Sequence, residues 1–289
     1  MKKKFPEIPA VPAVLLSIIS VQGSASIAKG IFPVLGAAST SSLRIGFSAI
    51  ILCLFNRPNL KDMDRAQWKA VSLYGLALGA MNVIFYMAIA RIPLALGVAL
   101  EFIGPLTLAL AGSKRMVDFI WVLLAAAGIA LIAPWSNNGL DVIGMLLALL
   151  AGAFWAGYIV LGGRISKIMD GGKAVSIGMV FATALVLPIA IGDGLLTNFK
   201  PSMLATGLVL ALFSSAIPFT LEMQALRKIP AKTFSILMSL EPAAAAFSGL
   251  IFLHEFLSLF EWLAVVLIII ASVGSTLTTK NSVHASPES

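Results

Sequence analysis

Five ionisable residues lie within strongly apolar stretches of this sequence. They are Lys29, Arg44, Glu101, Glu222 and Glu241. A charged side chain inside a membrane costs free energy unless it is paired or hydrated, so such a residue is first interpreted as functional. We therefore expect these five residues to form a buried polar site for a small charged molecule.

Together the two cations and the glutamates suit a small zwitterion. Arg44 can hold a carboxylate through two parallel hydrogen bonds, and Lys29 adds a second positive charge. Glu101 and Glu241 can each pair with an ammonium group. Because a carboxyl group shielded from water can exchange a proton near neutral pH, we expect transport coupled to protons. The predicted proton carrier is Glu101 or Glu241, with Glu222 as a further candidate.

Neighbouring polar residues indicate which helix faces look inward. Residues three, four or seven positions apart share one face of a helix, which places Gln22 with Lys29 and Asn82 with Tyr86. The complete set of predicted substrate-binding residues is Gln22, Lys29, Arg44, Asn82, Tyr86, Glu101 and Glu241.

Structural roles for these charges stay open at this point. Glu222 lies near the end of its apolar stretch, close to Arg227 and Lys228, and could form an ion pair there. The long side chain of Lys29 could reach the membrane interface. Arg44, Glu101 and Glu241 could each belong to a buried pair with no role in binding.

Prolines occur close to several of these groups. A proline within a helix leaves the carbonyl four residues earlier without its hydrogen-bond donor. Pro105 frees the carbonyl of Glu101, Pro218 frees that of Ser214, and Pro242 directly follows Glu241. Interrupted helices beside buried carboxylates are typical of transporter binding sites.

Other spacings indicate packing. Gly75 and Gly79 permit two helices to approach closely, and we expect this within the bundle. Trp155 and Tyr158 share a face, but an aromatic stripe at this spacing more often packs than binds, so we do not assign them to the site.

The elements that must position these residues are membrane-spanning helices. The 289 residues are 59% hydrophobic and only 11% charged, with a mean hydropathy of +1.00, whereas soluble domains carry roughly 25% charged residues. This composition excludes a soluble enzyme, a nucleic-acid-binding domain and a membrane anchor with a soluble head. Apolar windows of about 20 residues predict ten transmembrane helices in an all-α membrane fold. Their ranges are 11–32, 39–56, 68–90, 93–113, 117–135, 141–162, 173–192, 203–226, 231–253 and 257–278.

Basic residues predict the orientation of these helices. One side holds almost all of the loop lysines and arginines, starting with the run 2–4 and the connection 57–69, whereas the other side holds Arg91 and Lys200. Positive charge concentrates in cytoplasmic loops, so both termini are predicted to be cytoplasmic.

The two halves of the sequence resemble each other. Residues 88–93 (AIARIP) are echoed by 225–230 (ALRKIP), and each segment is followed by a glutamate, Glu101 or Glu241. Because each half has five predicted spans, the second must enter the membrane from the opposite face. This predicts two inverted five-helix repeats around a central cavity, a construction common in secondary transporters. The predicted segments are an N-terminus at 1–10, repeats at 11–136 and 137–279, and a tail at 280–289.

Residues for catalysis or metal binding are sparse. The sequence has one cysteine, Cys53, and two histidines, His254 and His284, and it lacks a glycine-rich phosphate loop at a helix start. We expect no enzymatic activity, no cofactor and no metal. The expected partners are a small-molecule substrate and the lipid bilayer, and no nucleic acid, because the net charge of +7 is explained by orientation.

The buried charged residues and the segments around them make the sequence resemble the EamA branch of the drug/metabolite transporter superfamily, which is built as two five-helix halves. The likeness covers residues 10 to 279. The segments that carry it are Gln22–Gly23, Ala25–Lys29, Leu43–Arg44, Gly79–Asn82, Val98–Phe102, Gly104–Pro105, Val117–Phe119, Leu221–Met223, Leu237–Pro242 and Ala271–Thr278. One departure is His254, where the family pattern usually has glycine.

This resemblance implies export of small amino acids such as threonine and homoserine across the bacterial inner membrane. An alternative keeps the fold and changes the cargo to a drug or another metabolite, with import as a further option. A scaffold or sensor in the membrane is the alternative from a different class, and it would need neither buried charges nor inverted halves.

Overall fold

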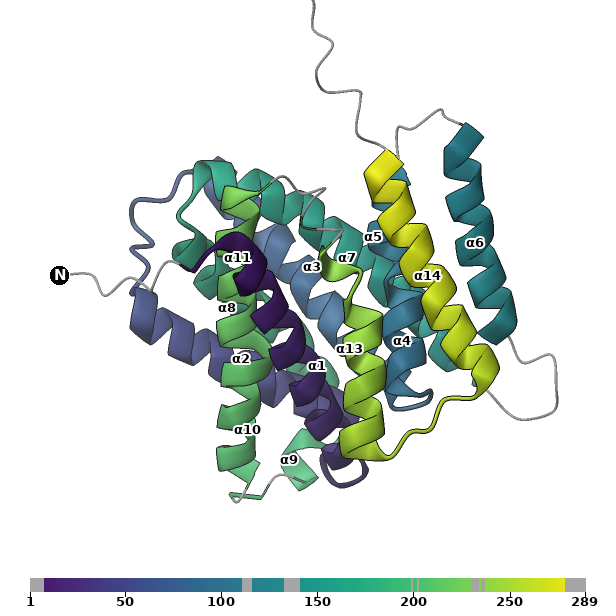
Figure 1. Cartoon of the computed structure of the whole chain (residues 1–289). Helices are drawn as coiled ribbons and strands as arrows, with labels where there is room; N and C mark the ends of the chain where they lie inside the picture. Colours follow the sequence, from purple (N-terminus) through teal and green to yellow (C-terminus); the bar gives the residue numbers. More distant parts are fainter. Residues whose placement is uncertain are drawn as a thin grey trace, which may run out of the picture.

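The computed structural model describes residues 8–110, 116–132, 141–198, 200–201, 203–229, 234 and 237–278, and its regular elements there are all helices (Figure 1). The elements η1 and η2 are single π-helical turns. In chain order the elements are α1 (Ala10–Leu35), α2 (Ala37–Asn56), α3 (Arg65–Ile89), α4 (Leu94–Glu101), α5 (Ile103–Leu110), α6 (Met116–Ile132), α7 (Val142–Ile168), α8 (Gly171–Gly192), α9 (Leu195–Asn198), α10 (Met203–Ala211), η1 (Leu212–Ala216), α11 (Ile217–Lys228), α13 (Glu241–Ser248), η2 (Gly249–Leu253) and α14 (Leu259–Thr278).

Six helical segments of the described chain are long and apolar enough to cross a membrane: α1, α2, α3, α7, α8 and the continuous run Met203–Lys228. Shorter apolar helices cover Leu94–Leu108, Glu241–Leu253 and Leu259–Ala271. Each of the ten predicted ranges contains helix, which confirms the all-helical class, while the count of ten spans and the location of the termini stay predictions. Large apolar side chains such as Ile19, Leu54 and Leu123 face outward, as contact with lipid requires.

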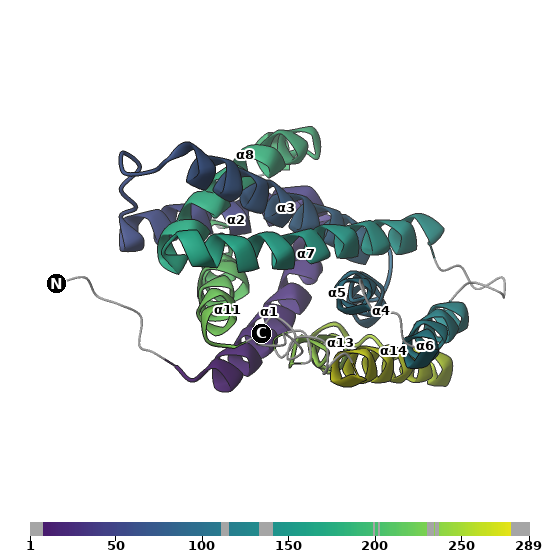
Figure 2. The ribbon, with the colours of Figure 1, turned by 90° about the horizontal axis from the view of Figure 1, so that it is seen from above.

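One side of the bundle is a four-helix scaffold of α2, α3, α7 and α8 (Figure 2). Helix α3 packs along both α7 and α8, and α2 packs along α8, so the scaffold joins the two halves of the sequence (Figure 2). Helices α6 and α14 pair with each other at one edge of the molecule (Figures 1 and 2).

Aspartate side chains cap the start of all four scaffold helices. Asp64 accepts a hydrogen bond from a backbone N–H in the first turn of α3, Asp141 does so in α7, and Asp170 does so in α8. The cap of α2 is Asp193, which comes from the end of α8 and accepts from the N–H of Ala38 at 3.0 Å. These caps supply acceptors for N–H groups that have no partner within their own helix.

The close approach expected at Gly75 and Gly79 is confirmed. A Cβ atom added to Gly75 would overlap the backbone of Gly178 in α8, and one added to Gly79 would meet the backbone of Ala182. Small residues therefore set the distance between α3 and α8 within the bundle.

Several helical segments outside the scaffold are interrupted. Helix α4 ends at Glu101 and α5 begins two residues later, close to Pro105. The run from α10 to α11 contains the π-helical turn η1, which precedes Pro218, and a second π-helical turn, η2, ends the segment that starts at Glu241. The α4–α5 break and η1 thus occur beside Pro105 and Pro218, as expected, whereas η2 begins seven residues after Pro242.

Helix α7 holds the α4–α5 break by direct backbone contact. A Cβ atom on Gly152 would overlap the carbonyl group of Glu101, and one on Gly104 would overlap the carbonyl group of Gly152. The backbone at Glu101 therefore leaves no room for a side chain at position 152.

We predict that Gly152→Ala lowers the unfolding temperature of the purified protein, because overpacking against backbone costs about 1–3 kcal/mol. Gly157→Ala is the matched control on the same helix, since a Cβ atom there meets nothing within 4 Å. It should be neutral or slightly stabilising, because alanine favours helix over glycine. Equal unfolding temperatures for the two variants would contradict the tight contact.

Candidate functional site

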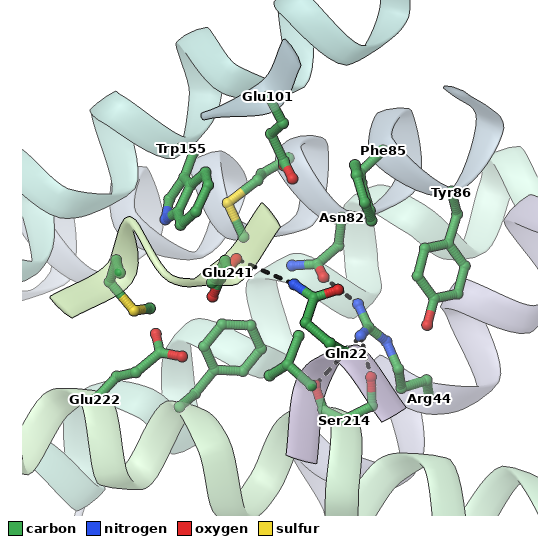
Figure 3. A pocket seen from close by; sticks show the side chains of 14 residues that line it. Gln22, Arg44, Asn82, Phe85, Tyr86, Glu101, Trp155, Ser214, Glu222 and Glu241 are labelled. Carbon is green, nitrogen blue, oxygen red and sulfur yellow. Dashed lines mark hydrogen bonds between the residues drawn. The ribbon is translucent and has the colours of Figure 1, made fainter. Parts of the chain in front are cut away.

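A polar cavity of about 50 Å³ lies where helices of both halves meet (Figure 3). It is several times the ~10–15 Å³ that one water molecule requires. Its lining residues are Val21, Gln22, Arg44, Met81, Asn82, Phe85, Tyr86, Glu101, Trp155, Ser214, Phe219, Glu222, Met238 and Glu241.

Arg44 is the cation of this cavity and is 2% exposed. Its guanidinium group donates to Asn82 Oδ1 and to both the hydroxyl and the carbonyl oxygen of Ser214, and it lies 4.6 Å from the ring centroid of Tyr86. The Ser214 carbonyl is the one expected to lack its helical donor because of Pro218. The interrupted helix thus provides an acceptor for the buried charge.

Three carboxyl groups lie on other walls of the cavity, each at most 6% exposed. Glu241 accepts a hydrogen bond of 3.2 Å from the amide nitrogen of Gln22. Glu222 accepts from the hydroxyl groups of Ser17, at 2.6 Å, and Tyr158, at 3.1 Å. Glu101 extends into the same space from the end of α4 (Figure 3).

Several buried polar atoms around the cavity have no hydrogen-bond partner within the described chain. They are Nε of Arg44, the hydroxyl group of Tyr86 and Oε1 of Gln22. Buried polar groups are normally paired, so unpaired ones that line a cavity indicate a place for a polar ligand. The donors, on Arg44 and Tyr86, match a carboxylate, and the acceptor on Gln22 lies with the glutamates that match an ammonium group.

Six of the seven predicted substrate-binding residues line this one cavity: Gln22, Arg44, Asn82, Tyr86, Glu101 and Glu241. Glu222 lines it as well, and its partners are hydroxyl groups of Ser17 and Tyr158 rather than the basic residues at the end of its helix.

Lys29 is the exception, because it is not among the residues that line the cavity. Its ammonium group lies 2.6 Å from Glu255 Oε1 and also donates to the carbonyl oxygen of Ile92 at 2.8 Å. The structure therefore separates Lys29 from Arg44, and the expected pair of cations does not form within the cavity.

Sequence reasoning did not assign several residues that the structure brings to the cavity. Trp155 lines the wall and packs edge-on against Phe102, and Tyr158 reaches Glu222. Their spacing on one helix face predicts packing and does not by itself indicate a binding role. Ser17, which donates to Glu222, lies five positions from Gln22, a spacing that does not predict a shared helix face.

The unpaired hydroxyl group of Tyr86 offers a specific test. Tyr86→Phe keeps the ring beneath Arg44 and removes an oxygen with no described partner, so we expect an unchanged unfolding temperature. If this hydroxyl group binds substrate, the apparent affinity in counterflow assays should fall by about 5- to 10-fold. Tyr74→Phe, outside the cavity lining, is the control and should leave the affinity unchanged. Equal affinities for Tyr86→Phe and the unaltered protein would remove Tyr86 from the binding site.

Apolar helices around a buried polar cavity, with interrupted helices beside its charges, are the features of a membrane transporter. The family model described as the EamA-like transporter family matches residues 142–277. Together with the relatives described next, this shows that the chain belongs to the EamA-like transporter family.

Close relatives are similar over almost their entire length. The chain is 42% identical over 283 residues to the threonine/homoserine exporter RhtA of Salmonella typhimurium (strain LT2), covering 96% of this chain and 95% of that protein. It is 41% identical over 280 residues to RhtA of Escherichia coli (strain K12), with the same coverage. A more distant relative is the uncharacterized transporter YwfM of Bacillus subtilis, 27% identical over 238 residues and 79% of each chain. A solved crystal structure that is 17% identical matches 96% of this chain and all of its own with a TM-score of 0.62, which supports the fold alone.

Proposed function

We propose that this protein exports small amino acids, threonine and homoserine in particular, across the bacterial inner membrane. The observation that carries the proposal is identity of 41–42% over 96% of the chain to exporters named for these two amino acids. The cavity supports it, because donors on Arg44 and Tyr86 and acceptors on Glu101, Glu241 and Gln22 match the two charges of an amino acid.

The exporter is arranged as ten transmembrane helices in two inverted repeats, at 11–136 and 137–279, with both termini in the cytoplasm. Support comes from the distribution of basic residues, which leaves Arg91 and Lys200 on the opposite side. We call the side with Arg91 the outer face. The chain functions without catalysis, cofactor or metal.

Export is coupled to the opposite movement of protons, and Glu101, Glu241 or Glu222 carries the proton. The support is that three carboxyl groups share one cavity from which bulk water is largely excluded. While one of these carboxylates carries the proton, the other two remain as acceptors for the ammonium group of the substrate.

Counterflow in proteoliposomes tests the cargo. Vesicles loaded with unlabelled threonine should accumulate labelled threonine and labelled homoserine with saturable kinetics. Amino acids with large side chains and a panel of other metabolites serve as comparison. Saturable exchange restricted to solutes other than amino acids would overturn the assignment and favour a carrier of another metabolite.

A further inference from the structure

Lys29, which the cavity does not use, forms a compact network with Glu255. One carboxylate oxygen of Glu255 is 2.6 Å from the Lys29 ammonium, and the other accepts from the backbone N–H of Leu94 at 2.8 Å. Lys29 also donates to the carbonyl oxygen of Ile92. A single carboxylate therefore ties the end of α1 to the start of α4, and the two charged side chains are only 16% and 20% exposed.

The local backbone directs Glu255 toward this position. The π-helical turn η2 ends at Leu253, and the next residue, His254, adopts a left-handed conformation with φ of 54°. The N–H of Glu255 then bonds to the carbonyl oxygen of Gly249 at 3.1 Å, so the chain turns back on itself. A Cβ atom on Gly249 would lie 3.2 Å from the Glu255 carboxylate, so glycine gives this side chain room.

An apolar cluster connects this network to the cavity. It includes Ala25, Ala28, Phe85, Tyr86 and Leu94, so it contacts the cavity at one end and the network residues at the other. Phe32 packs against its far side, with its ring centroid 5.2 Å from that of Tyr86. Nearly all of these apolar side chains are buried, and the cluster runs from the cavity residues Phe85 and Tyr86 to Leu94 in the network.

A second ion pair at the same end of the molecule differs in what it joins. Arg91 lies 2.7 Å from Asp141, and these side chains are 46% and 32% exposed. Arg91 donates a hydrogen bond that holds the pKa of the Asp141 carboxyl group below its usual range. This pair links α3 and α7 within the scaffold, where the helices already pack along their length. The Lys29–Glu255 pair instead links elements that line the cavity.

We propose that Lys29 and Glu255 form a latch that closes the outer face of the cavity and must open in each transport cycle. The elements it joins are α1, α4 and the segment after η2, which are distinct from the scaffold and include the interrupted helices. The latch spans 226 positions of sequence and so fastens one half to the other. The inference rests on the proposed transport function, and the term outer face rests on the proposed orientation.

Thiol labelling tests the latch without any substrate. In a Cys53→Ala background, Ala25→Cys places a thiol within the apolar cluster, where Ala25 is 2% exposed. A membrane-impermeant maleimide added from outside should label it slowly. Adding Lys29→Met or Glu255→Gln should raise the labelling rate by about tenfold, because loss of the latch raises a minor open state. Both substitutions together should give the rate of either alone, since each removes the same bond.

Arg91→Met is the matched control, because it removes the neighbouring ion pair and leaves the latch intact. It should leave the labelling rate unchanged. A second measurement joins Lys29→Cys and Glu255→Cys with a short, reducible thiol cross-linker. The cross-link should stop counterflow, and reduction should restore it.

Unchanged labelling in both single variants would overturn the latch, and so would full counterflow through the cross-linked protein. A rise in labelling seen only with reagent on the cytoplasmic side would overturn its assignment to the outer face. A wrong cargo assignment would leave the labelling results as expected, so the two failures are distinguishable.

Discussion

Threonine counterflow is expected to fall by about 100-fold or more when Arg44 is replaced by methionine. Truncating one partner of a buried, hydrogen-bonded charge pair costs about 2–5 kcal/mol, and the substrate carboxylate is the partner we assign to Arg44. Arg44→Lys should lose most of this activity as well, because an ammonium group cannot reproduce the planar contacts to Asn82 and Ser214. The measurement is the initial rate of labelled threonine entry into loaded proteoliposomes.

Arg164→Met, at an exposed position on α7, is the control for loss of an arginine and should retain full counterflow. Because Arg44 also holds helix α2 to η1, folding must be checked separately. Each variant should elute as a single species in detergent and keep its helical circular dichroism. Counterflow close to that of the unaltered protein in a folded Arg44→Met variant would remove Arg44 from the binding site.

The helices could be predicted from the sequence because apolar length is a strong signal in a membrane protein. The effects of proline and glycine could also be predicted, because each acts on its immediate neighbours in the helix. Pro218 removes one N–H group, which leaves the Ser214 carbonyl for Arg44, and Gly75 has no side chain to hold α8 away. These consequences follow from the chemistry of one residue and its helical neighbours.

The convergence of Gln22, Arg44, Asn82, Tyr86, Glu101 and Glu241 on one cavity could also be predicted. A polar group in an apolar helix has few stable places other than the interior of the bundle. The role of Trp155 in the cavity wall was harder to predict. Trp155 packs against Phe102 and lines the cavity at once, and nothing in its spacing distinguishes these roles.

The partner of Lys29 could not be predicted. Glu255 follows an apolar segment near His254, in a position that suggests an ordinary loop carboxylate. Its role depends on the π-helical turn and the left-handed residue before it, which redirect the side chain toward α1. Such turns arise from packing across the bundle, and local sequence patterns carry little information about them.

Neutral substitutions of the cavity carboxylates are expected to separate substrate exchange from proton coupling. Glutamine keeps the shape of glutamate and one accepting oxygen, but it carries no charge and cannot release a proton. In proteoliposomes with an acidic interior, protons that leave should drive threonine inward in the unaltered protein. We expect Glu101→Gln or Glu241→Gln to reduce this driven accumulation by about tenfold while counterflow without a pH gradient persists.

Comparing the glutamine variants of the three glutamates identifies the residue that carries the proton. The three carboxylates can be distinguished because each has different protein partners. Glu222 is held by two hydroxyl groups and Glu241 by Gln22, whereas Glu101 lies beside the α4–α5 break. A substitution that removes both driven transport and counterflow marks a residue needed to bind the ammonium group itself. Asp62→Asn, at an exposed position between α2 and α3, should change neither measurement.

If Glu101→Gln and Glu241→Gln both keep full accumulation driven by the pH gradient, neither residue couples transport to protons. Glu222 would then be the remaining candidate, with Glu222→Gln as its test.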